Sequence, residues 1–116
     1  MAEERNVGAP PGMDLMELEI WRKRIDGIDD QLMRLLNSRS ACAVEIGRIK
    51  RALGLPIYAP EREAWVLDRV MRESPGPLEP LAVRRVFERI IDESRRLERI
   101  SAEAEVETDA EETQPE

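Results

Sequence analysis

One apolar pattern runs from Asp14 to Leu53 without a proline, and it constrains the fold more than any other feature of the chain. Its steps alternate between three and four residues, which is typical of a helix that packs along one face. Asp14 is a plausible N-cap, and Gly54 and Pro56 end the pattern. We therefore predict one helix of about 40 residues, or roughly 58 Å at 1.5 Å per residue. The pattern consists of Leu18, Trp21, Ile25, Ile28, Leu32, Leu35, Cys42, Ile46, Ile49 and Leu53.

A helix of this length is longer than a domain of 116 residues is wide. The rest of the chain is too short to cover its apolar face, so a second copy of the chain is the natural partner. The geometry thus predicts a homodimer. Gly27 and Gly47 lie inside the helix, where each costs about 1 kcal/mol relative to alanine. We expect another helix or a ligand to approach both closely.

Two shorter helices are predicted after the long one. The first starts at Pro60, a favourable first-turn residue, and ends near Ser74, before the next proline and glycine. The other starts at Pro80 and carries Val83, Val86, Phe87, Ile90, Ile91, Ser94, Leu97 and Glu98 at helical spacing. The fold class is therefore all-α, with residues 14–101 as one helical domain. Residues 1–13 are predicted to be a flexible arm, and residues 102–116 a disordered acidic tail.

The net charge of −7 comes from the C-terminal tail. Seven of the 25 acidic residues lie in 102–116, which has no basic residue, so the rest of the chain has 18 acidic and 18 basic residues. This balance argues against nucleic-acid binding. The N-terminal stretch lacks the apolar run of a signal peptide, and no segment has the ~18 apolar residues of a membrane span. We expect a cytoplasmic protein.

The residue inventory excludes several kinds of chemistry. Cys42 is the one cysteine and histidine is absent, which rules out a disulfide framework, a zinc site and a nucleophile activated by histidine. A reaction on this chain must use Arg, Lys, Asp and Glu, and no metal is expected.

Arg39 breaks the apolar pattern of the long helix, between Leu35 and Cys42. An arginine is rarely buried without an anion. Lys50 lies about 20° from the same face and ~16 Å along the axis, so the two cations can converge on a ligand. The alternative is that Arg39 reaches solvent or pairs with an acid of another helix.

Further polar residues interrupt the other helices. Ser94 and Glu98 replace apolar residues on a stripe of the third helix, although a solvated helix end would also explain them. Arg62 stands in a first turn, where a cation opposes the helix dipole unless an anion is near. Arg22 is about 25 Å and 100° from Arg39, so the two can share a small site in a dimer but not within one chain.

Four strings together resemble the all-α chorismate mutases: WRKRIDGIDDQLMRLLNSR, AVEIGRIK, PEREAWVL and FERIIDESRRLE. The resemblance covers Leu18 to Arg99. It implies an intertwined homodimer that rearranges chorismate to prephenate, on the route to phenylalanine and tyrosine. The reaction is concerted: an ether C–O bond breaks as a C–C bond forms. It needs no nucleophile, metal or cofactor.

The resemblance also implies residue roles. Arg39 and Arg62, with Arg22 from the partner subunit, would hold the two carboxylates of chorismate. Lys50 would donate to the ether oxygen and to a carboxylate, and Ser94 would hydrogen-bond a carboxylate.

The remaining roles concern the ring hydroxyl and the ether oxygen. Glu63 would accept from the hydroxyl, and Glu98, if protonated, would donate to the ether oxygen. The expected catalytic residues are thus Lys50, Glu98 and Arg39. Ala59 departs from the family pattern, because many members carry an aspartate there that contacts the hydroxyl or the ring edge.

Two other functions remain open. An isochorismate-pyruvate lyase of the same fold uses a similar cationic site. A non-catalytic helical dimerisation module is also possible, but it would leave Arg39 unexplained.

Overall fold

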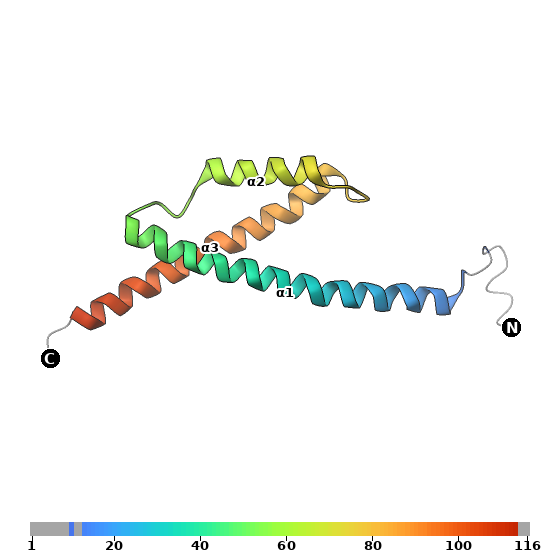
Figure 1. The fold of residues 1–116 in the computed structure, drawn as a ribbon, viewed down its shortest axis with the longest axis horizontal. Helices are drawn as coiled ribbons and strands as arrows, with labels where there is room; N and C mark the ends of the chain where they lie inside the picture. Colours follow the sequence, from blue (N-terminus) through green and yellow to red (C-terminus); the bar gives the residue numbers. More distant parts are fainter. Residues whose placement is uncertain (1–9, 11–12, 114–116) are drawn as a thin grey trace. The chain divides into compact units, whose positions relative to one another are not determined.

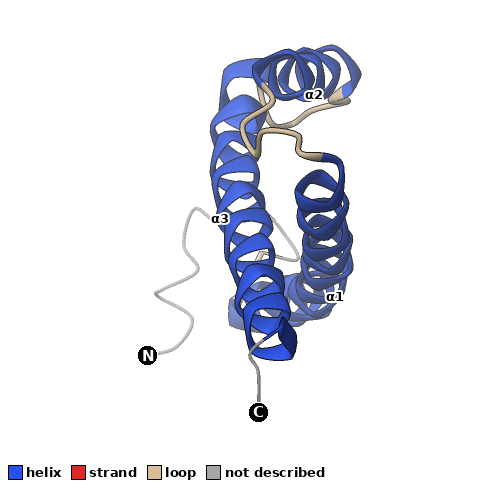
Figure 2. Cartoon of the chain, turned by 90° about the vertical axis from the view of Figure 1, so that its left-hand side faces the viewer, coloured by secondary structure: helices blue, strands red, loops and turns tan. Residues whose placement is uncertain are grey.

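The computed structural model describes residue 10 and residues 13–113, with side chains as far as Ala104. Three helices follow in order: α1 (Leu15–Leu53), α2 (Pro60–Glu73) and α3 (Pro80–Thr113) (Figure 1). Figure 2 shows helices and loops, and no strand, in this described part. The all-α prediction and the starts of the helices are confirmed. The predicted arm at residues 1–13 lies almost wholly outside the described residues.

The chain divides into two compact units, residues 1–38 and residues 39–116. The first unit contains the N-terminal part of α1. Its apolar stripe is 44–67% exposed, and an added Cβ at Gly27 would meet nothing within 4 Å. The stripe therefore finds no cover within the described chain. Its residues are Leu18, Trp21, Ile25, Ile28, Leu32 and Leu35.

In the second unit, Gly54 ends α1 and turns the chain back. Its φ of 69° is in the left-handed region, which costs glycine little. The Leu55 amide donates to the Lys50 carbonyl at 2.8 Å, the bond of a Schellman motif. This turn sends residues 55–59 back alongside the last turns of α1, where the Ile57 carbonyl meets the Lys50 side chain.

α2 begins with Pro60 at its first turn and packs against α3. Ala59 is the N-cap residue and offers no side-chain cap to the helix. Glu61 and Glu63 lie in the first turn, where acids favour the positive end of the helix dipole.

α1 and α3 approach each other closely at Gly47. A Cβ there would lie 2.8 Å from Cα of Glu98, and closer still to the Glu98 carbonyl oxygen and the Ser101 hydroxyl. Ser101 is buried, with Oγ 3.1 Å from the carbonyl oxygens of both Val44 and Glu98. The close approach predicted at Gly47 is confirmed. Ala43 and Ile91 are the buried hydrophobic residues of the described chain.

α3 is longer than predicted: its backbone stays helical to Thr113. This differs from the disordered tail predicted from Ala102 onward. The segment is highly charged, but residues 102–113 contain no glycine or proline and are rich in alanine and glutamate, which favour a helix. Residues 114–116 lie outside the described chain.

Candidate active site

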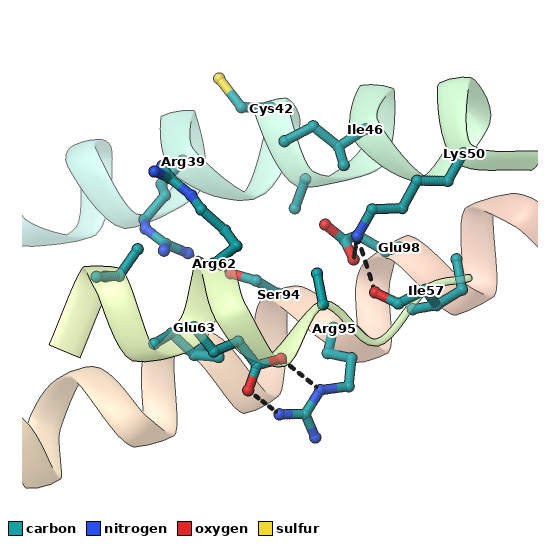
Figure 3. A pocket seen from close by; sticks show the side chains of 14 residues that line it. Arg39, Cys42, Ile46, Lys50, Ile57, Arg62, Glu63, Ser94, Arg95 and Glu98 are labelled. Carbon is teal, nitrogen blue, oxygen red and sulfur yellow. Dashed lines mark hydrogen bonds and ion pairs between the residues drawn. The ribbon is translucent and has the colours of Figure 1, made fainter. Parts of the chain in front are cut away.

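A cavity of about 260 Å³ opens in the second unit between the C-terminal part of α1, the start of α2, the middle of α3 and the connection from α1 to α2 (Figure 3). Six of the seven predicted site residues line it, together with Ala59, Cys42 and Arg95. The six are Arg39, Lys50, Arg62, Glu63, Ser94 and Glu98.

Lys50 and Glu98 form an ion pair on one side of this pocket. Lys50 Nζ lies 3.0 Å from Glu98 Oε2 and 2.8 Å from the Ile57 carbonyl oxygen. The Lys50 and Glu98 side chains are only 16% and 12% exposed. An ammonium has three N–H donors, so two are used and one remains for a ligand. The position of Lys50 thus depends on the Gly54 turn, which brings Ile57 back.

Arg39 and Ser94 meet on the other side of the pocket in the view of Figure 3. Arg39 Nη1 donates to Ser94 Oγ, and the Ser94 hydroxyl donates to the Ile90 carbonyl at 3.0 Å. The serine therefore fixes the guanidinium while its own proton stays within α3.

Arg95 is a pocket residue that sequence reasoning missed. Its Nε donates to Glu63 Oε2 at 3.0 Å and its Nη2 to Glu63 Oε1 at 2.6 Å. These hydrogen bonds raise the pKa of Arg95 above its ordinary value and outweigh the effect of partial burial, which lowers it. The two residues are far apart in the sequence and lie beside, not on, the apolar stripes, so no local pattern pairs them.

Arg62 stacks on Trp65 with its guanidinium carbon 4.6 Å from the ring centroid. Within the described chain, no acidic side chain forms an ion pair with Arg62 or Arg39, whereas Glu98 pairs with Lys50 and Glu63 with Arg95. The pocket lining has four cationic groups and two carboxylates, which leaves two positive charges.

Arg22 lies in the first unit and is not a lining residue of this pocket. It is exposed, with Nη1 3.9 Å from Glu19 Oε2. In the described part of the chain, no cluster of three or more His, Cys, Asp or Glu side chains could hold a metal ion. No described helix is long and apolar enough to cross a membrane.

Comparison with known proteins decides the family. The model of the family chorismate mutase type II matches residues 21–99. The chain belongs to this chorismate mutase family. The match agrees with the resemblance of Leu18 to Arg99, and its residues include every predicted site residue.

Chorismate mutases of known sequence and structure are similar to this chain. It is 40% identical over 90 residues to the bifunctional chorismate mutase/prephenate dehydratase of Pseudomonas aeruginosa, covering 73% of this chain and 25% of that protein. The chain thus spans about a quarter of the length of the first curated relatives that it matches.

Two solved chorismate mutases share the fold. The Thermus thermophilus enzyme (form II) superposes with a TM-score of 0.70 at 36% identity, over 71% of this chain and 93% of that one. The Helicobacter pylori enzyme in complex with prephenate gives a TM-score of 0.68 at 29% identity, over 74% of this chain and 93% of that one.

Proposed function

We propose that this chain catalyses the rearrangement of chorismate to prephenate in the pocket between α1, α2 and α3. The observation that carries the proposal is the pair Arg39 and Arg62. Both line the pocket and neither forms an ion pair with an acid of the described chain. Two such guanidiniums match a substrate with two carboxylates, since each can bind a carboxylate with two parallel hydrogen bonds.

The chemistry of the pocket suits a concerted rearrangement. Bound carboxylates restrain the flexible dianion near its reactive shape. As the ether C–O bond breaks, negative charge grows on the ether oxygen, and the remaining N–H of Lys50 is a donor for it. Ser94 adds a hydroxyl beside Arg39, and Glu63 accepts from the ring hydroxyl.

Glu98 is the second donor in this proposal. Its carboxylate accepts from Lys50 at 3.0 Å, and a carboxyl group can donate to the ether oxygen only when it carries a proton.

We propose further that the working form is an intertwined homodimer in which Arg22 of the partner subunit completes each pocket. The exposed apolar stripe of the first unit supports it, because six large apolar side chains on one helix face are costly to leave in water. In this form, residues 14–101 supply all the groups that act on the substrate. The expected cytoplasmic location stays a prediction.

Turnover of two substrates tests the function. The purified chain is incubated with chorismate and, separately, with isochorismate. We expect prephenate from chorismate. Salicylate and pyruvate from isochorismate alone would instead identify the lyase, and turnover of neither substrate would favour the non-catalytic module.

A further inference from the structure

Arg95 on α3 donates two hydrogen bonds to the carboxylate of Glu63 on α2 (Figure 3). The contact is bidentate, with N–O distances of 3.0 and 2.6 Å, and the Arg95 and Glu63 side chains are 32% and 22% exposed. A two-point contact fixes both the place and the plane of a carboxylate, whereas a single contact leaves it free to turn.

Arg95 is itself held on two other sides. Its guanidinium carbon lies 5.1 Å from the centroid of the Tyr58 ring, and Nη2 lies 3.6 Å from Asp92 Oδ1. Tyr58 belongs to the connection between α1 and α2, so Arg95 links this connection to α3 and to the first turn of α2. The orientation of Glu63 therefore depends on three parts of the second unit.

The pair leaves Glu63 able to serve a ligand. An ionised carboxylate has about four lone-pair sites, and the two bonds from Arg95 use one on each oxygen. A ligand hydroxyl can thus donate to Glu63 without displacing Arg95. Ala59 contributes no polar side-chain atom to this wall, and the other lining carboxylate, Glu98, is engaged by Lys50.

We propose that Arg95 is a positioning residue that holds Glu63 for the substrate's ring hydroxyl and thereby makes the pocket selective for a hydroxylated dianion. The proposal rests on the proposed function. It assigns to Arg95 an action through Glu63, and no contact with the carboxylates of the substrate.

Kinetics with two substrates distinguish a positioning role of Arg95 from direct contact between Arg95 and the substrate's carboxylates. Chorismate and an analogue with hydrogen in place of the ring hydroxyl are compared in the wild type, Arg95→Met and the matched control Arg96→Met, whose exposed arginine is the next residue of α3 and does not line the pocket. We expect Arg95→Met to lower kcat/KM for chorismate about tenfold, the scale of one hydrogen bond, and to leave kcat/KM for the analogue within about twofold. Arg96→Met should change neither.

The coupling to Glu63 is tested in a second background. In a Glu63→Ala chain, adding Arg95→Met should cost chorismate turnover no more than about twofold, because the group that Arg95 positions is gone. Arg95→Lys keeps the positive charge but cannot make the two-point contact with Glu63, so its kcat/KM for chorismate should lie between those of the wild type and Arg95→Met. Arg95→Lys also serves as the test variant if Arg95→Met does not fold stably.

Equal losses on both substrates, or a full loss in the Glu63→Ala background, would overturn the proposal and make Arg95 a direct carboxylate ligand or a structural residue. The absence of any loss in Arg95→Met would also overturn it. A wild type that turns over neither substrate would mean instead that the proposed function is wrong.

Discussion

Lys50 on α1 and Glu98 on α3 form an ion pair with 3.0 Å between Nζ and Oε2, and both side chains are largely buried. The pair places an acid beside the donor expected to meet the ether oxygen.

We predict that Glu98→Gln keeps turnover of chorismate, whereas Glu98→Ala lowers it by about 100-fold. Glutamine keeps an N–H donor for the ether oxygen and an oxygen that can accept from Lys50, and alanine keeps neither. Steady-state kcat/KM of the two variants checks this. Inactivity of Glu98→Gln would show that Glu98 is not the donor.

Arg39→Ala should reduce turnover by about 100-fold or more, because it removes a ligand for the substrate dianion. Stability should change by less than about 1 kcal/mol, since the pocket already has more cations than carboxylates. Steady-state kinetics and urea denaturation measure the two effects, with the exposed Arg34→Ala on the same helix as control. A variant that unfolds, yet turns over normally in its folded fraction, would make Arg39 a structural residue.

Gly47→Ala should destabilise the chain by about 1–3 kcal/mol, because the added methyl group collides with the α3 backbone at Glu98 and with Ser101. Activity should fall as well, since Glu98 must shift. Gly27→Ala is the control on α1: an added Cβ there would meet no atom of the described chain within 4 Å, so alanine should not disturb the packing at Gly47. The melting temperatures of both variants and the wild type, measured by thermal unfolding, test this prediction. Equal melting temperatures would mean that α1 and α3 do not approach at Gly47.

Ala59→Asp should have two separable effects. As the N-cap of α2, aspartate should stabilise the fold by about 0.5–2 kcal/mol. As a pocket residue it adds an acceptor near the ring hydroxyl, and we expect the KM for chorismate to fall a few-fold. Ala59→Asn supplies a cap without the charge and serves as control. A rise in KM would indicate that the added charge repels the dianion.

Refolding an equal mixture of Arg22→Ala and Arg39→Ala chains should restore activity if Arg22 acts across a dimer. Half of the dimers are mixed, and each mixed dimer has one pocket with both arginines, so about a quarter of the wild-type activity should return. Light scattering should give the mass of a dimer. Activity no higher than that of the two variants alone, or a fully active monomer, would contradict the dimer.

The three helices and most of the residues that line the pocket could be predicted from the amino-acid sequence. Helical periodicity depends on neighbours three and four residues away, so a short stretch of sequence is enough to detect it. The prolines and Gly54 mark the limits of the helices. Arg39, Ser94 and Glu98 stood out because each interrupts an apolar stripe. The family resemblance added Glu63 and specified the roles.

The pairing of side chains from different helices could not be predicted from the sequence. Glu63 with Arg95, Lys50 with the Ile57 carbonyl, and Gly47 against Ser101 join residues on different elements. Such pairs depend on the rotation and offset of one helix against another, which no local period specifies. The C-terminal end of α3 differs from the prediction for a local reason. The acidic charge of residues 102–116 suggested disorder, whereas the helix propensity of alanine and glutamate keeps the backbone helical to Thr113.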